Sequence, residues 1–225
     1  MQIIKLDATD STNDYLRQMI LDTALTTPTV VWSMFQKKGK GQRGNVWTSP
    51  RGKNLMFSLY IPNLSRNADQ LFSINKIVSV CLADWLLSLQ IPNISVKWPN
   101  DILSGDKKLA GILVESSVQK STAKSIIIGM GINVNQIQFP QLPNATSMRL
   151  RTAKSYDLNT LLLSFLPKLI EGLIETGCNI EDIGLALSPT AYFAQFELGT
   201  DAVAMVTASH NENGWTGIKM GIEKG

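Results

Sequence analysis

The sequence is poor in histidine and cysteine, two residue types that many catalytic and metal sites use. Its 225 residues include one histidine, His210, and two cysteines, Cys81 and Cys178. Cys81 lies in an apolar helical pattern, so we expect no disulfide framework and a reducing compartment, the cytoplasm. We also find no Ser-His or Cys-His arrangement that would activate a nucleophile.

Long hydrophobic runs are absent too. No apolar run approaches the roughly 20 residues that a membrane-spanning helix needs. The first residues, MQIIKLDATD, lack the basic and apolar regions of a signal peptide. Hydrophobic residues make up 44% of the chain and charged residues 17%, which is ordinary for one globular domain or slightly more. We expect a soluble protein without a membrane partner.

Acidic residues are scarce before residue 171 and common after it. Residues 1–170 carry 19 Lys+Arg and 10 Asp+Glu, giving a net charge of +9. Residues 171–225 carry 2 and 8, giving −6. This reversal of sign predicts two segments with different functions or different origins.

The spacing of apolar residues predicts an α+β domain with a mixed or antiparallel sheet. Three helices are expected, at residues 11–24, 70–89 and 157–174, the last of them kinked or broken at Pro167. Residues rich in β-branched and aromatic side chains predict strands at 29–35, 55–61, 95–98, 109–115 and 125–129. The sequence SGDKK, with Gly105 and Asp106, predicts a turn that joins residues 95–98 to 109–115.

Residues 36–47, QKKGKGQRGNVW, combine small residues with positive charge. The glycines at 39, 41 and 44 allow the backbone to approach a ligand and to expose N–H groups to an anion. Six cations and no acid lie between residues 37 and 53. The spacing matches neither a Walker loop nor G-x-G-x-x-G. By itself the pattern indicates phosphate binding, a solvated loop or, less favoured, a nucleic-acid patch, for which stacking aromatics are few.

A second stretch, residues 96–116, reads VKWPNDILSGDKKLAGILVES. Proline after Trp98 requires an extended bend, which would place Asn100 and Asp101 at the end of a strand. Asp101 could hold Mg²⁺, which takes one or two carboxylates together with phosphate oxygens. Lys108 would face the same region across the hairpin and meet a carboxylate or phosphate. The alternative is a polar turn with solvated lysines.

Two shorter stretches also carry polar groups. In DSTND, residues 10–14, Ser11 and Asp14 fit a capping box at the start of the first helix. Alternatively, this stretch could bind a small polar ligand through the hydroxyls of Ser11 and Thr12 and the amide of Asn13. In GMGINVN, residues 129–135, Asn133 could contact a nucleotide or close a turn.

In order and spacing, four motifs resemble the catalytic domain of biotin protein ligases: STN, Q-x-x-G-K-G-x-x-G-N-x-W, KWPNDI…KKLAGILVE and G-x-G-I-N. Lipoate ligases are related in fold, but KWPND with the KGQRGN loop resembles the biotin branch. The resemblance covers about residues 1–168, and we expect a catalytic domain over residues 1–169. It implies an α/β fold like that of class II aminoacyl-tRNA synthetases.

The resemblance also implies roles for single residues. Biotin would be bound by Ser11, Thr12, Asn13, Gln36, Gly39, Gly41, Gln42, Arg43, Lys108 and Gly111. ATP would be bound by Lys40, Asn45, Trp47, Asn100, Asp101 and Asn133. Catalysis would depend on Lys108, Lys40 and Arg43, and Asp101 would hold Mg²⁺. Lys40, Gln42 and Asn45 stand where the commoner GRGRxGR form of the loop has arginines.

The implied reaction joins biotin to ATP as biotinyl-5′-AMP and then transfers biotin to a lysine of a biotin carboxyl carrier protein. ATP and Mg²⁺ are the expected cofactors, biotin is the substrate, and a homodimer is left open. No helix-turn-helix segment precedes the domain, so we expect no nucleic-acid partner. The alternative function is a biotin-binding domain impaired in transfer.

The end of the chain resembles a different family. Residues 176–221 are similar to phosphohexomutases (phosphoglucomutase/phosphomannomutase), in which the serine of TASHN, here Ser209, carries the transferable phosphate. We expect residues 170–225 to be a phosphohexomutase-like fragment joined to the ligase domain, in place of the SH3-like domain that usually follows it. A further alternative is a mutase fragment that is active only with a partner.

Overall fold

The computed structural model describes residues 1–62, 66–119, 122–175, 202–207 and 217–222. Contacts between residues divide the chain into two units. The larger unit runs from Ile4 to Cys178, and the smaller combines Met1–Ile3 with Asn179–Gly225. In the smaller unit the described backbone after Ile3 forms an antiparallel pair, β11 (Ala202–Thr207) and β12 (Gly217–Ile222). Within these described ranges, no helix is long and apolar enough to cross a membrane.

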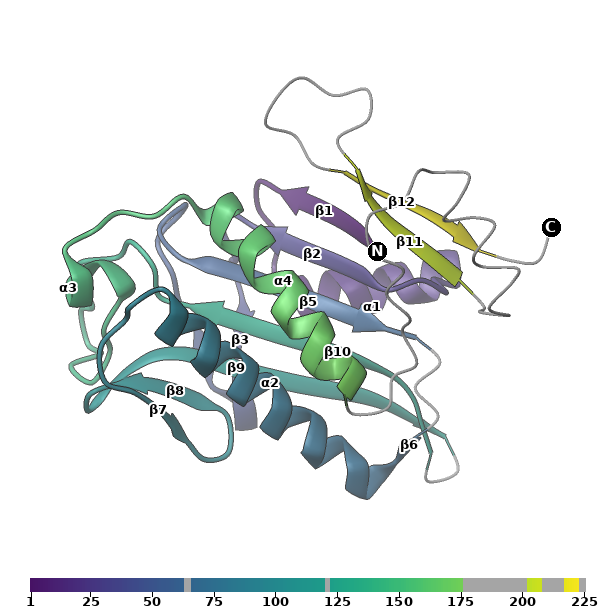
Figure 1. Cartoon of the computed structure of the whole chain (residues 1–225), viewed down its shortest axis with the longest axis horizontal. Helices are drawn as coiled ribbons and strands as arrows, with labels where there is room; N and C mark the ends of the chain where they lie inside the picture. The colour runs from purple at the N-terminus through teal and green to yellow at the C-terminus, as the bar shows by residue number, and fades with distance from the viewer. Residues whose placement is uncertain (63–65, 120–121, 176–201, 208–216, 223–225) are drawn as a thin grey trace. The chain divides into compact units, whose positions relative to one another are not determined.

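One sheet organises the larger unit (Figure 1). Its strands follow the order β1 (Gln2–Leu6), β2 (Thr29–Ser33), β5 (Leu55–Ile61), β10 (Thr122–Ile132), β9 (Lys107–Gln119), β8 (Asp101–Ser104) and β7 (Ile94–Lys97), and β6 (Arg66–Asn67) also pairs with β10. All pairings from β2 to β7 are antiparallel. Beyond the ends of β1 and β2 an isolated parallel bridge joins Thr9 to Gln36, which agrees with a mixed sheet, one of the two arrangements predicted.

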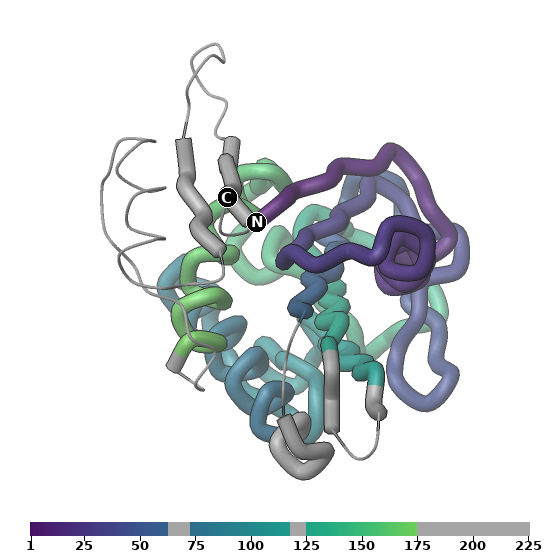
Figure 2. The backbone as a smooth tube through the Cα atoms, turned by 90° about the vertical axis from the view of Figure 1, so that its right-hand side faces the viewer, coloured from purple at the N-terminus to yellow at the C-terminus, as the bar shows by residue number. Residues whose placement is uncertain are grey.

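The alternation of side chains along the strands gives the sheet two apolar faces. On one face, α1 (Thr12–Thr23) contributes Leu16 to a buried cluster with Val31, Tyr60 and Ile127 of β2, β5 and β10. On the other face lie α2 (Ala68–Ser88) and α4 (Leu158–Glu175). There Phe165 meets the ring of Phe57 edge-on at 6.2 Å and the ring of Trp85 at 4.9 Å. Figure 2 shows α1 on the opposite side of the sheet from α2 and α4.

The predicted helices are all present. Ser11 is the N-cap of α1, and its hydroxyl accepts from the backbone N–H of Asp14 at 3.4 Å. Two outcomes were predicted at Pro167, a kink or a break of the helix. The prediction of a break is wrong, because α4 continues through Pro167 to Glu175. The lost hydrogen bond is offset by burial of an apolar stripe that includes Leu162, Phe165 and Leu169.

The structure contains strands that were not predicted, of which β8 is the most informative. The predicted hairpin of residues 95–98 and 109–115 contains an additional strand, β8, which pairs with both β7 and β9. β8 has only four residues, too few for an alternation pattern to stand out, but its Ile102 is fully buried. The first strand, β1, was not predicted from the sequence either. The predicted strand at 55–61 coincides with β5.

Candidate functional site

A cleft of about 380 Å³ lies over the face of the sheet that α1 covers in part. It brings together most of the residues predicted from the sequence. Those that line it are Ser11, Thr12, Asn13, Gln36, Lys40, Gly41, Gln42, Arg43, Asn45, Trp47, Asn100, Asp101, Lys108 and Gly111. Their elements are far apart in the chain, so the cleft depends on the pairing of β8, β9 and β10.

Gly39 and Asn133 are the two predicted site residues that do not line the cleft. Gly39 belongs to β3 (Gly39–Lys40), which pairs with β4 (Val46–Trp47). A Cβ at Gly39 would lie 2.4 Å from the carbonyl oxygen of Trp47, so close backbone approach requires glycine there. Asn133 is 5% exposed. Its backbone N–H donates to the carbonyl of Leu109 at 2.9 Å, and its carbonyl accepts from the N–H of Met148 at 3.0 Å. Contact of either residue with a substrate stays a prediction.

Glycines of β9 and β10 form the floor of the cleft. Gly111 pairs with Gly131 across the two strands, and a Cβ at Gly131 would lie 2.4 Å from the indole ring of Trp47. A Cβ at Gly129 would lie 2.3 Å from the side-chain oxygen of Asn13. Trp47 and Asn13 can therefore pack directly on the sheet only because these strand positions lack side chains. Gly129 and Gly131 belong to the GMGINVN stretch, but neither was predicted as a site residue.

A polar corner is built where the start of α1 meets β5. The side-chain oxygen of Gln36 accepts from the backbone N–H of Thr12 at 2.7 Å and from its hydroxyl at 3.1 Å. The hydroxyl of Ser58 lies 2.6 Å from the Thr12 hydroxyl and also bonds the side-chain oxygen of Asn13. With its oxygen occupied, Gln36 is left with its amide N–H groups as donors. Ser58, fully buried in β5, was missed because a lone serine in an apolar strand carries no signal.

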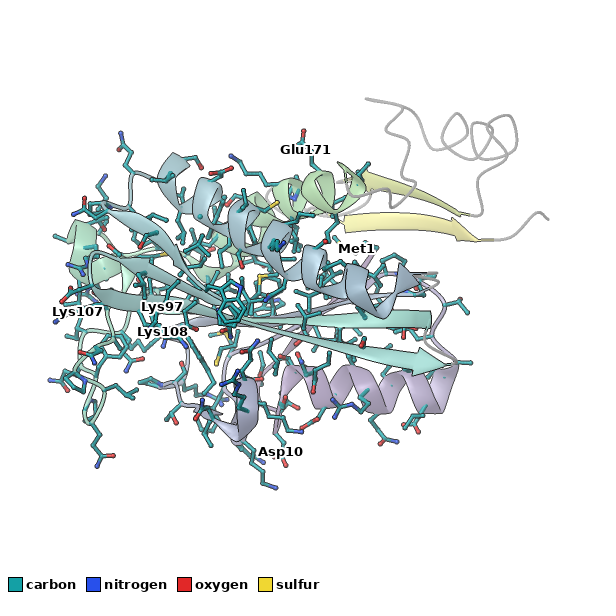
Figure 3. The ribbon with its side chains drawn as sticks, turned by 90° about the horizontal axis from the view of Figure 1, so that it is seen from below. Met1, Asp10, Lys97, Lys107, Lys108 and Glu171 are labelled. Carbon is teal, nitrogen blue, oxygen red and sulfur yellow. The ribbon has the colours of Figure 1, made fainter. Side chains whose placement is uncertain are left out.

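Lys108 and Asp101 form an ion pair in the lining of the cleft. The Lys108 ammonium lies 2.7 Å from the Asp101 carboxylate and 5.8 Å from the centre of the Trp47 ring. Lys97 pairs with Asp101 in the β7–β8 ladder and is labelled near Lys108 in Figure 3. Asn100 is held by the sheet, since its amide nitrogen donates to the carbonyl of Ile112 at 2.8 Å. Lys108 thus faces the same region as Asp101, as predicted, and its contact with a substrate stays a prediction.

The basic loop forms a small hairpin around η1 (Gln42–Gly44). Arg43 and Gly44 both have positive φ, 54° and 80°, and the N–H of Gly41 donates to the carbonyl of Asn45 at 2.7 Å. At its start Lys38 pairs with Asp10 at 2.9 Å. That ammonium holds the pKa of Asp10 below its ordinary value, and the carboxylate raises the pKa of Lys38. The hairpin places Lys40 and Arg43 on the cleft.

The residues fit Mg²⁺ only as an ion shared with phosphates. Asp101 is the carboxylate among the lining residues, and in the described part of the chain no three His, Cys, Asp or Glu residues cluster as a metal site. Mg²⁺ commonly uses one or two carboxylates and completes its octahedron with phosphate oxygens and water. Asp101 supplies the one carboxylate that such a site requires.

Apolar groups complete the lining, from Val46, Trp98, Pro99, Ile112, Leu113 and Met130. Trp98 and Pro99 belong to the KWPND motif, but none of these six residues was predicted as a site residue from the sequence.

This cleft lies within the part of the chain that matches a known family. The model of the Biotin/lipoate A/B protein ligase family matches residues 6–133, more than half of the chain. The chain belongs to this family. The match includes every residue that lines the cleft.

Two curated relatives carry related names. The bifunctional ligase/repressor BirA of Salmonella typhimurium is 37% identical over 129 residues, 57% of this chain and 39% of that protein. The biotin–[acetyl-CoA-carboxylase] ligase of Paracoccus denitrificans is 30% identical over 129 residues, 57% of this chain and 53% of that protein. The matched segment thus spans about two fifths to half of the length of these relatives.

Solved structures confirm the fold. The biotin protein ligase from Aquifex aeolicus, in complex with biotin and ATP, superposes with a TM-score of 0.65 at 28% identity. The superposition covers 77% of this chain and 71% of the Aquifex chain. The predicted α+β fold of biotin protein ligase catalytic domains is therefore correct.

The end of the chain matches a second family, as the sequence indicated. The model of the phosphoglucomutase/phosphomannomutase alpha/beta/alpha domain I matches residues 151–225. The phosphomannomutase/phosphoglucomutase of Pseudomonas putida is 40% identical over 55 residues, 24% of this chain and 12% of that protein. Ser209, predicted as the phosphate carrier, lies outside the described residues.

Proposed function

We propose that the protein is an ATP-dependent biotin protein ligase, which makes biotinyl-5′-AMP and transfers biotin to a lysine of a biotin carboxyl carrier protein. One observation carries the proposal: Lys40, Arg43 and Lys108 border the same cleft as the polar corner. Cations suited to phosphates and a carboxylate thus share a cavity with hydrogen-bonding groups suited to a small neutral ring. Family membership supports the same reaction.

In the first step, a carboxylate oxygen of biotin attacks the α-phosphorus of ATP. The new bond is an acyl–phosphate bond, and the bond from the α-phosphorus to the bridging oxygen breaks, so pyrophosphate leaves. Both reactants are anions, so Lys108, Lys40 and Arg43 lower their repulsion and stabilise the charge on the phosphoryl oxygens. Mg²⁺ held by Asp101 would supply further positive charge at the phosphates.

The polar corner binds the other end of the substrate. Thr12 and Gln36 are oriented by their mutual hydrogen bonds and by Ser58, so their remaining donor and acceptor positions are fixed before a ligand arrives. Such pre-orientation lowers the entropic cost of aligning the carboxylate with ATP.

In the second step, the uncharged amine of a carrier lysine attacks the carbonyl of the mixed anhydride. The amide bond forms, AMP leaves with the electron pair of the broken bond, and the amine gives up a proton. No enzyme nucleophile takes part, in keeping with a chain whose only histidine is His210.

We propose residues 1–169 as the ligase catalytic domain and residues 170–225 as a phosphohexomutase-like fragment.

Biotin-dependent exchange of labelled pyrophosphate into ATP, with Mg²⁺ and the full chain, tests the first step. We expect exchange with biotin and none without it, and lipoate in place of biotin is the specificity control. Exchange with lipoate alone would assign the chain to lipoate activation instead. Biotin binding by calorimetry without any exchange would reduce the protein to a binding domain.

A further inference from the structure

Asp14 lies next to the cleft without lining it and holds one of the cations of the basic loop. Its carboxylate oxygen Oδ1 accepts from the Lys40 ammonium at 2.7 Å and from the Arg17 guanidinium at 2.7 Å. Lys40 lines the cleft, whereas Asp14 and Arg17 belong to α1. One carboxylate oxygen is therefore shared between a residue of the site and a residue of the scaffold.

Arg17 has a second carboxylate partner. Its other terminal nitrogen lies 2.8 Å from Glu115 on β9, and Glu115 accepts from the side-chain nitrogen of Asn13 at 2.7 Å. If Lys40 turns to another partner, Asp14 still pairs with Arg17, and Glu115 does as well, so neither carboxylate loses its last cation partner. Loss of the Lys40–Asp14 pair therefore does not carry the cost of an uncompensated charge.

The Lys40–Asp14 pair is exposed enough to be exchanged. The side chains of Lys40 and Asp14 are 46% and 33% exposed. Pairs of this kind contribute little net stability, and an anion with several charges competes well for the lysine. The carboxylate of Asp14 carries one charge, already shared with Arg17.

We infer that Asp14 is a positioning residue, which holds Lys40 at the edge of the cleft before substrate binds and yields it to the incoming phosphate groups. The inference rests on the proposed function for the identity of the anion. Asp14 then competes with the substrate for Lys40, and after the exchange Arg17, which Asp14 shares with Glu115, is the cation that remains beside Asp14.

A purely structural role for Asp14 would be helix capping. Its backbone N–H does donate to the hydroxyl of Ser11, at 3.4 Å, but its carboxylate accepts from two cations, Lys40 and Arg17. Asparagine at position 14 keeps the backbone donor and removes the negative charge. Asp14→Asn therefore separates competition for Lys40 from the capping of α1.

The test measures pyrophosphate binding to the full chain by calorimetry in the presence of Mg²⁺. We expect Asp14→Asn to lower the Kd for pyrophosphate about two- to fivefold, the range that the loss of one exposed ion pair allows. Asp22→Asn is the matched control, because Asp22 lies on the same helix and bonds Gln18 rather than a cation. In a Lys40→Gln background the effect of Asp14→Asn should disappear.

Three results would overturn the inference. They are an unchanged or weaker affinity in Asp14→Asn, an equal gain in Asp22→Asn, or a gain that persists in the Lys40→Gln background. If the wild-type chain binds pyrophosphate but shows one of these results, the proposed function stands and only the role of Asp14 is lost. If the wild-type chain does not bind pyrophosphate at all, both are wrong.

Discussion

At the scale of single residues, the site depends on which side chains already have partners. Asn13 uses its amide nitrogen for Glu115 and its oxygen for Ser58, so two of its hydrogen-bonding positions are committed to the protein. The Lys108 ammonium pairs with Asp101 and lies over the ring of Trp47, but its side chain is 38% exposed, so it can meet an anion without first leaving a buried network. Both residues were predicted to bind biotin, but Asn13 is already held by two hydrogen bonds, whereas Lys108 is part of a partly exposed ion pair.

Lys108→Ala should therefore impair chemistry far more than stability. We expect biotin-dependent pyrophosphate exchange to fall at least about 100-fold, as when one preorganised group that stabilises the transition state is removed. The melting temperature should change little, because the lost ion pair is partly exposed. Lys107→Ala, at the neighbouring position of β9, is the control. Full exchange activity in Lys108→Ala would mean that another cation supplies the charge.

At the scale of elements, the ends of the helices are fixed by side chains that the sequence displays. Asp157 precedes α4, and its carboxylate accepts from the backbone N–H and the hydroxyl of Thr160, both at 2.8 Å. These hydrogen bonds lower the pKa of Asp157 below its ordinary value of 3.8. The cap holds a helix whose Phe165 packs on Phe57 beneath the sheet.

Asp157→Ala should lower the free energy of unfolding by about 1 kcal/mol at neutral pH, the usual cost of losing an N-cap. Asp157→Asn is the control, since asparagine also caps but does not titrate. Because the pKa of Asp157 is lowered by folding, the stability from its charged form is complete above about pH 3.8 and is lost as pH falls through the folded-state pKa. Urea unfolding at several pH values measures this. A constant difference between wild type and Asp157→Asn down to about pH 2 would contradict it.

Among the strands, the alternation of side chains decides which residues face α1 and the polar corner. Ser58 and Tyr60 share one face of β5, while Phe57 lies on the other, against Phe165 of α4. The sequence predicted β5 correctly, but it did not show which face carries the site. That choice follows from where α1 packs.

At the scale of the whole molecule, charge is divided along the chain. Residues 1–170 carry a net charge of +9 and contain every residue that lines the cleft, whereas residues 171–225 carry −6. A positively charged segment attracts anionic substrates over about a Debye length, roughly 10 Å at 0.1 M salt.

This charge predicts that salt weakens the binding of ATP more than that of biotin. Between about 0.05 M and 0.5 M NaCl, the KM for ATP in the exchange reaction should rise several-fold, because screening acts on a ligand with several charges. The KM for biotin, a monoanion, should rise less. Equal changes for both substrates would show that the charge of the segment does not guide ATP.

The sequence by itself determined the α+β class, the helices, the capping by Ser11 and the motifs that identify the family. These features depend on local spacing, since helix periodicity, caps and glycine-rich loops are properties of neighbouring residues. Only the tertiary structure decided that Ser58 orients Thr12, that Gly129 and Gly131 admit Asn13 and Trp47 to the sheet, and that Lys40 pairs with Asp14. These contacts join residues 26 to 116 positions apart, and no local pattern specifies which distant strand lies beneath a side chain.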